Sequence, residues 1–173
     1  NNKAESPYDL FTTGHGGTVL STALGLAMAR DQVEGTHHVV AIIGDASLGE
    51  GMALEALNHI GHLKPNLLVI LNDNRMSIAK PIGGLSRYLN RIITNPVYNR
   101  IRLDIEQLVR RLPHGSQLVR LGRKVEESLK GLLVPGLVFE ELGFRYVGPI
   151  DGHCLPDLIT TLHNVKQLQG PIF

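Results

Sequence analysis

Apolar and polar residues alternate along the chain in blocks that predict the strands and helices of an α/β domain. Residues 38–43 and 67–71 are short runs rich in valine, isoleucine and leucine, each followed at once by polar residues, as expected for buried strands. Residues 52–60, between them, have apolar side chains at helical spacing, and Gly61 follows as a candidate helix stop. A strand, a helix and a strand with short links predict a parallel βαβ unit, and the continuously apolar strands predict cover on both faces of the sheet.

Regular patterns also flank this unit. Residues 19–29 form an apolar run that is too long for a strand and predicts a buried helix ending near Arg30. Near the carboxyl end, the pattern predicts a helix, a strand, a helix and the beginning of a strand, over residues 138–142, 144–147, 155–168 and 171–173. We therefore expect residues 1–173 to form a single, partial α/β domain with a parallel β-sheet flanked by helices.

Residues 77–131 differ in character from the rest of the chain. Between Arg87 and Lys130 there are ten lysines and arginines against four acidic residues, whereas the remainder of the chain has seven against twelve. Prolines and paired glycines interrupt the helical pattern throughout. We expect a basic, mobile excursion beside the functional site, and the alternative is a permanently solvated surface segment. The stretch lacks the interleaved aromatic residues that bind single-stranded nucleic acid.

Composition and charge narrow the class of protein. The 173 residues are 43% hydrophobic and 19% charged, which suits one globular domain with its own core. The net charge of +1 predicts no attraction to nucleic acid, and no apolar run reaches the ~18 residues that cross a membrane. Cys154 is the single cysteine, which suits a reducing, cytoplasmic location. The first residue is not methionine and the last residues begin a strand, so we expect part of a longer protein.

The most informative polar residues directly follow the two central strands. Asp45 comes after the first strand and Asn74 after the second, and in parallel sheets ligands bind at the carboxyl ends of the strands. A carboxylate and an amide oxygen are ligands that Mg²⁺ prefers. A helix opening near residues 49–51 would add free N–H groups, so we expect a metal and diphosphate site. The structural alternative is that Asp45 caps that helix and Asn74 fills a turn.

A second candidate anion site is the glycine loop, residues 14–18 (Gly-His-Gly-Gly-Thr). Glycines let the backbone approach a phosphate closely. Val19 stands where a dinucleotide fingerprint needs glycine, and the chain has no Walker A sequence, which excludes both of those motifs. His15 could serve as a general acid or base, or as a hydrogen-bond donor. The alternative is a structural histidine that bonds to the loop's own backbone.

Together these motifs resemble a known family. Gly44 and Asp45, with Asn74 following 29 residues after the aspartate, resemble the cofactor signature of thiamine-diphosphate enzymes. Within that superfamily the chain resembles the 1-deoxy-D-xylulose-5-phosphate synthases. The likeness is weakest over residues 85–125 and rests on ESPYDLFTTGHGGTVLSTALGLAMARD (5–31), GDASLGEGMALEALNHIGHLKPNLLVILNDNRMSI (44–78), VPGLVFEELGFRYVGPIDGH (134–153) and LITTLHNVKQLQGP (158–171).

The resemblance implies a thiamine-diphosphate-binding fold with a bound magnesium ion. The metal ligands would be the side chains of Asp45 and Asn74 and the backbone carbonyl of Met76. The cofactor would be contacted by residues of both motifs, with His15 as the candidate catalytic residue: Gly14, His15, Gly16, Ala46, Ser47 and Asn74. Three departures from the family pattern stand out, namely Ala46 in place of glycine, Gly16 and Gly17 in place of small hydroxyl residues, and Arg75 in place of an acidic residue.

For the parent enzyme, the resemblance implies a homodimer that joins pyruvate to glyceraldehyde 3-phosphate with release of CO₂. The product would feed isoprenoid, thiamine and pyridoxal biosynthesis. A glutamate and further histidines needed for that activity would lie outside the chain, so we expect the chain alone to be inactive. Two alternatives are another thiamine-diphosphate enzyme, such as a transketolase or a 2-oxoacid dehydrogenase component, and a non-catalytic binding module of this fold.

Overall fold

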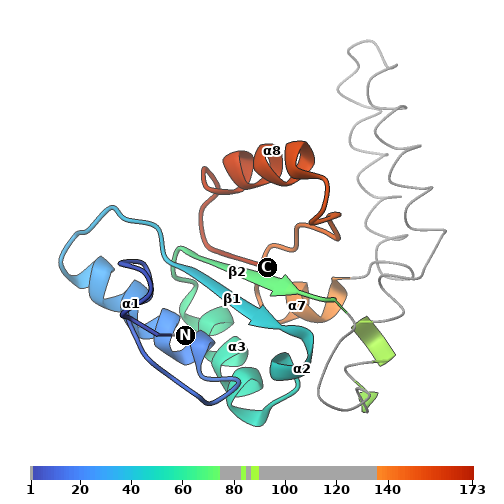
Figure 1. The fold of residues 1–173 in the computed structure, drawn as a ribbon, viewed down its shortest axis with the longest axis horizontal. Helices are drawn as coiled ribbons and strands as arrows, with labels where there is room; N and C mark the ends of the chain where they lie inside the picture. The colour runs from blue at the N-terminus through green and yellow to red at the C-terminus, as the bar shows by residue number, and fades with distance from the viewer. Residues whose placement is uncertain (1, 75–82, 85–86, 90–135) are drawn as a thin grey trace.

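The structure, a computed structural model, describes residues 2–74, 83–84, 87–89 and 136–173. Within these residues the strands form one parallel sheet in the order β1-β2-β3 (Val40–Gly44, Leu67–Asn72 and Pro171–Ile172). Helices α1 (Val19–Gln32) and α3 (Gly51–Leu63) lie on one face of the sheet, and α8 (Leu155–Val165) lies over the other (Figure 1). The predicted α/β class, a parallel sheet flanked by helices, is therefore confirmed.

Two short helices complete the described elements: α2 (Asp45–Leu48) directly follows β1, and α7 (Leu137–Glu141) precedes α8 in the chain. The sequence pattern did not predict α2, because four residues are too few to show helical spacing. Most of the basic excursion, residues 77–131, lies outside the described residues, as do Arg75 and Met76. No helix in the described part of the chain is long and apolar enough to cross a membrane.

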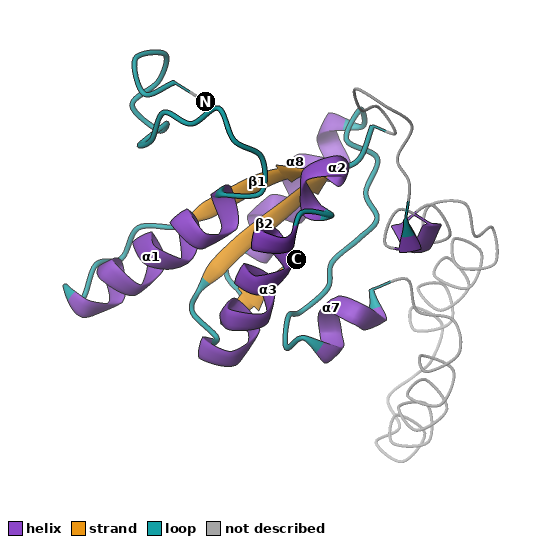
Figure 2. Ribbon diagram, turned by 90° about the horizontal axis from the view of Figure 1, so that it is seen from below, coloured by secondary structure: helices purple, strands orange, loops and turns teal. Residues whose placement is uncertain are grey.

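The core lies between one face of the sheet and the two helices below it. Ala41 and Ile43 of β1 and Leu67 and Val69 of β2 alternate with residues of the opposite face and are all buried. Figure 2, seen from below, shows α1 and α3 side by side across this face. Their buried residues recur at helical spacing: Leu20, Ala23, Leu24 and Ala27 from α1, with Ala53, Ala56, Leu57 and Ile60 from α3.

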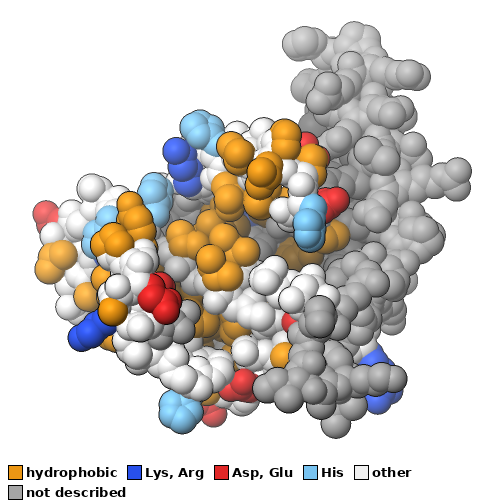
Figure 3. Space-filling model, viewed as in Figure 1, with side chains coloured by type: hydrophobic (Ala, Val, Ile, Leu, Met, Phe, Trp, Pro, Cys, Tyr) orange, Lys and Arg blue, Asp and Glu red, His pale blue; other side chains and the backbone are white. Residues whose placement is uncertain are grey.

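The opposite face of the sheet is covered only in part. Helix α8 packs over β2, but Val40 and Ile42 of β1 keep 48% and 64% of their surface exposed. Figure 3 shows apolar side chains gathered over this part of the molecule. The expectation that helices cover both faces is therefore wrong for β1 in the described part of the chain. An apolar strand sequence shows that a strand can be buried on both sides, but which neighbours cover it is decided by tertiary packing.

Helix α3 continues past Gly61, the predicted stop. It ends at Leu63, and Lys64 provides the cap in a left-handed conformation with φ of 53°. Gly61 is needed for a different reason: a Cβ atom there would lie 1.6 Å from the backbone oxygen of Leu142. On the facing segment Gly143 has φ of 98° and lies against the backbone of Gly61. The two glycines let the end of α3 and the turn after α7 touch through their backbones.

The predicted strand over residues 144–147 pairs with β3 only through a single bridge between Arg145 and Ile172. Backbone hydrogen bonds still hold it parallel to β3, because Arg145 N–H donates to Pro171 O and Phe173 N–H to Arg145 O, both at 2.9 Å. Phe173 stacks on Phe139 of α7 with ring centroids 3.7 Å apart. Helix α8 ends at Val165, whereas the sequence pattern predicted that it would end at Leu168.

One buried charge ties helix α1 to the amino ends of the strands. The Arg30 guanidinium is 5% exposed and donates to the backbone oxygens of Asn66 at 2.8 Å and His37 at 3.3 Å. Its Nε also donates to Asp31 at 2.9 Å. Since His37 precedes β1 and Asn66 precedes β2, Arg30 braces the edge of the sheet opposite to the carboxyl ends of the strands.

Candidate functional site

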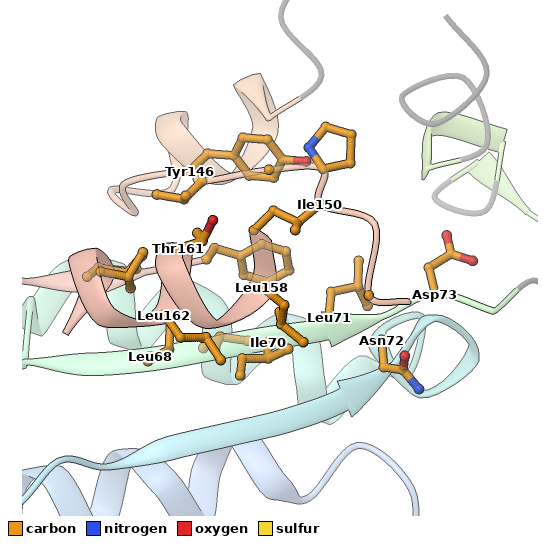
Figure 4. Close-up of a pocket in the computed structure, with 18 of the residues that line it drawn as sticks. Leu68, Ile70, Leu71, Asn72, Asp73, Tyr146, Ile150, Leu158, Thr161 and Leu162 are labelled. Carbon is orange, nitrogen blue, oxygen red and sulfur yellow. The ribbon is translucent and has the colours of Figure 1, made fainter. Parts of the chain in front are cut away.

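The two central strands end side by side, and this places the predicted site residues together. Gly44, the last residue of β1, pairs with Asn72, the last residue of β2. Asp45 follows Gly44 immediately, and Asn74 is two residues beyond Asn72. Figure 4 shows Asn72 and Asp73 at this end of β2. Asp45 and Asn74 therefore lie at one edge of the sheet, called here the carboxyl edge, as the parallel arrangement predicted.

The structure argues against a simple capping role for Asp45. The N-cap of α2 is Gly44, Asp45 is the first helical residue, and no side chain makes a cap hydrogen bond at this helix. The next helix, α3, is capped by Glu50 and likewise has no side-chain cap bond. Within the described residues the half-buried Asp45 carboxylate has no hydrogen-bond partner. It is therefore available to bind a cation.

The glycine loop reaches the same edge through a contact with Glu50. A Cβ atom on Gly16 would lie 2.1 Å from Glu50 Oε1, and one on Gly17 would lie 2.7 Å from Glu50 Oε2. Gly17 also has φ of 69°, which favours glycine. Because the loop leads into α1 and Glu50 caps α3, both helix amino ends present unpaired N–H groups here. Two motifs found separately in the sequence thus adjoin in space.

Within the loop, the expected cofactor-contacting residues are accessible. Gly14, His15 and Gly16 are all exposed. The loop is held by its own bonds, since Thr18 Oγ1 donates to His15 O at 3.3 Å and His15 N–H donates to Thr13 Oγ1 at 3.2 Å. The imidazole of His15 makes no hydrogen bond to the loop or to any other described residue. The structural alternative for this histidine therefore has no support in the described geometry.

The remaining expected contacts lie on α2. Ala46 is exposed and Ser47 half-buried, so both can be reached from the carboxyl edge. Ala46 stands in a right-handed helix, and its backbone is not among those with positive φ. The methyl group is thus accommodated where the family pattern has glycine. Its backbone N–H remains as a possible donor.

A pocket of about 370 Å³ opens between β2, α8 and the segment 146–153 (Figure 4). Leu68 and Ile70 of β2 face Leu158 and Leu162 of α8 across its apolar part. At the carboxyl end of β2 the lining includes the polar residues Asn72, Asp73 and Asn74, and His153 also lines the pocket. A volume of this size suits a small organic ligand or cofactor. The apolar chamber therefore opens beside Asn74, one of the expected metal ligands.

His153 is a site candidate to which the sequence analysis gave little weight. It lines the pocket together with Asn74, and its side chain is fully exposed. Its backbone N–H donates to Asp151 Oδ1 at 2.9 Å, and its Nδ1 lies 3.8 Å from the same oxygen. The available signal was its position after the run at 144–147, which lies parallel to β3. The turn after that run also reaches the carboxyl edge.

The residues at this edge fit magnesium better than a closed metal centre. No group of three histidine, cysteine, aspartate or glutamate side chains that could hold a metal occurs in the described part of the chain. Mg²⁺ needs only one or two protein oxygens when phosphate oxygens and water complete its octahedron. The carboxylate of Asp45 and the amide oxygen of Asn74 are oxygens of the kind that such a site uses, and both residues closely follow neighbouring strand ends. Two helix amino ends beside them suit the phosphates.

Comparison with known proteins identifies first the class and then the family. The fold matches the structure of a putative thiamin diphosphate-dependent enzyme from Mycobacterium smegmatis, with a TM-score of 0.53 and 15% sequence identity. The match covers 92% of this chain and 21% of that protein. The chain therefore shares the fold of the matching part of that protein. The family model of 1-deoxy-D-xylulose-5-phosphate synthase matches residues 1–173, and the chain belongs to this family.

Curated relatives agree with this assignment. The 1-deoxy-D-xylulose-5-phosphate synthase of Pelotomaculum thermopropionicum is 54% identical over 98% of this chain, and the match covers 26% of that protein. The enzyme of the same name from Carboxydothermus hydrogenoformans is 51% identical over 97% of this chain and 27% of that protein. The chain thus spans about a quarter of the length of the curated relatives that it matches.

Proposed function

We propose that this chain forms the diphosphate- and magnesium-binding part of a 1-deoxy-D-xylulose-5-phosphate synthase. Two observations support the proposal: Asp45 and Asn74 follow strand ends that pair with each other, and the glycine loop lies against Glu50 at the start of α3. The complete enzyme joins pyruvate to glyceraldehyde 3-phosphate with release of CO₂, at the start of isoprenoid, thiamine and pyridoxal biosynthesis. Family membership supports this choice of substrates over those of a transketolase.

Each part of the site then has a defined task. Asp45 and Asn74 would hold Mg²⁺, with the backbone carbonyl of Met76 as a third ligand, and the ion would supply positive charge that stabilises a bound diphosphate. The glycine loop and the amino ends of α1 and α3 orient the phosphates through backbone N–H groups. Thiamine diphosphate supplies, when bound, the carbon nucleophile and the electron sink for decarboxylation. His15, exposed within the loop, is the candidate for moving a proton at the substrate.

The proposal also concerns assembly and location. The family relatives are about four times as long as this chain, so other parts of the polypeptide complete the catalytic site. We propose a cytoplasmic homodimer as the active form. The chain by itself would bind the cofactor weakly and show no turnover.

A chimeric enzyme tests the proposed function. This chain replaces the matching quarter of the Pelotomaculum thermopropionicum enzyme, to which it is 54% identical. We expect the chimera to bind thiamine diphosphate in the presence of Mg²⁺, measured by calorimetry, and to form 1-deoxyxylulose 5-phosphate from the two substrates. The Asp45→Asn variant keeps the size of the side chain and removes its charge, so it serves as the matched control. A folded chimera that binds no cofactor would refute the proposal.

A further inference from the structure

The side chain of Glu50 lies against the glycine loop and does not cap helix α3. Its carboxylate occupies the space that a side chain on Gly16 or Gly17 would fill. Glu50 is exposed, makes no cap hydrogen bond at α3, and forms no ion pair among the described residues. A negative charge therefore rests on a loop whose glycines and neighbouring helix ends otherwise favour an anion.

The distances make this charge relevant to any bound phosphate. An anion that accepts hydrogen bonds from the backbone of Gly16 and Gly17 lies about 3 Å from their nitrogens, and hence within roughly 8 Å of the Glu50 carboxylate, which is inside the Debye length of about 10 Å at 0.1 M salt. At that separation, in a solvent-exposed site, two like charges weaken binding by about fivefold to tenfold, and salt reduces the effect. A bound Mg²⁺ offsets most of the charge on a diphosphate and so removes most of this repulsion.

We propose that Glu50 makes anion binding at the glycine loop dependent on the metal. Its carboxylate disfavours a free diphosphate group and tolerates one that carries Mg²⁺. The site thereby selects the metal-loaded cofactor over free pyrophosphate, phosphate esters and other polyanions. This inference rests on the proposed function, because it assumes that a diphosphate binds at the loop.

The same contact accounts for the glycines at positions 16 and 17. Side chains there would displace the Glu50 carboxylate, since a Cβ on Gly17 would also lie 3.1 Å from Glu50 Cβ. Gly16 and Gly17 are the two positions where the chain departs from the small hydroxyl residues of the family pattern. Glu50 and the two glycines therefore depend on one another. Because Gly16 and Gly17 have no side chains, the negatively charged Glu50 carboxylate can lie against the loop.

Binding of inorganic pyrophosphate tests the proposal. Calorimetry compares the chain with its Glu50→Gln variant, once in EDTA and once with saturating Mg²⁺. We expect Glu50→Gln to bind pyrophosphate about fivefold to tenfold more tightly in EDTA and less than twofold differently with Mg²⁺. Glu55→Gln is the matched control, because Glu55 is exposed on the same helix and loses the same charge. It should change neither affinity by as much as twofold.

The outcomes separate this proposal from the proposed function. Equal affinities of wild type and Glu50→Gln in EDTA, with binding otherwise intact, overturn the role of Glu50 alone. Weaker binding of Glu50→Gln with Mg²⁺ also overturns it, because Glu50 would then be a metal ligand. If neither the chain nor the chimera binds pyrophosphate or thiamine diphosphate with Mg²⁺, the proposed function and this inference both fail. Glu50→Ala replaces Glu50→Gln if circular dichroism shows that the latter is unfolded.

Discussion

Replacing Gly61 by alanine should destabilise the fold, although alanine is the better helix former. A Cβ at this position would lie 1.6 Å from the carbonyl oxygen and 2.8 Å from the carbonyl carbon of Leu142. Both partners belong to the backbone, one in α3 and the other in the turn after α7, so no side-chain rotation relieves the clash. The two segments must separate by more than an ångström. The methyl group therefore acts as overpacking in a close-packed interface.

The magnitude follows from two opposing effects. Overpacking of this kind costs about 1–3 kcal/mol and occasionally more, and a contact with backbone belongs at the upper end. Alanine regains about 1 kcal/mol in helix propensity over glycine. We expect a net loss of about 2 kcal/mol in the free energy of unfolding, or a fall in Tm of roughly 4–8 °C for a chain of this size.

Urea unfolding followed by circular dichroism measures the change. Gly25→Ala is the control, because Gly25 lies in the middle of α1 and an added Cβ there meets nothing within 4 Å. That variant should gain about 0.5–1 kcal/mol from helix propensity alone. Opposite signs for Gly61→Ala and Gly25→Ala would support the reasoning. A Gly61→Ala protein as stable as wild type would show that α3 does not approach Leu142 so closely.

Three further predictions concern the site and its scaffold. Asp45→Ala in the chimera should lower turnover at least ~100-fold, since it removes the only carboxylate among the proposed metal ligands; near-normal turnover at saturating Mg²⁺ and cofactor would contradict this. Arg30→Met should lower the free energy of unfolding by about 2–3 kcal/mol by leaving the carbonyls of His37 and Asn66 unpaired, without changing pyrophosphate affinity twofold. In the same chimera, His15→Asn should reduce kcat by about 10²–10⁴-fold, the typical contribution of acid–base catalysis, and leave cofactor affinity within about twofold. A loss of cofactor affinity without a loss of kcat would assign His15 to binding.

Much of the candidate site could be predicted because its residues directly follow strands or precede a helix in the sequence. Apolar runs of strand length followed by Asp45 and Asn74 need only the rule that parallel strands end at a common edge. The amino end of α1 after the glycine loop follows equally from local pattern. His153 could not be ranked in the same way. His153 follows the run at 144–147, which pairs with β3 through a single bridge between Arg145 and Ile172. So short a pairing leaves no periodic pattern in the sequence.

By itself, the sequence determined the α/β class, the order of the longer helices and strands, and the position of Asp45 and Asn74 at the carboxyl edge. Hydrophobic periodicity and the polar residues after each strand carry that information within a few consecutive residues. Only the tertiary structure decided that Gly61 serves a backbone contact, that Val40 and Ile42 stay exposed, and that Glu50 rests on the glycine loop. These features join segments far apart in the chain. They depend on which surfaces finally pack together, and a local pattern does not specify the partner.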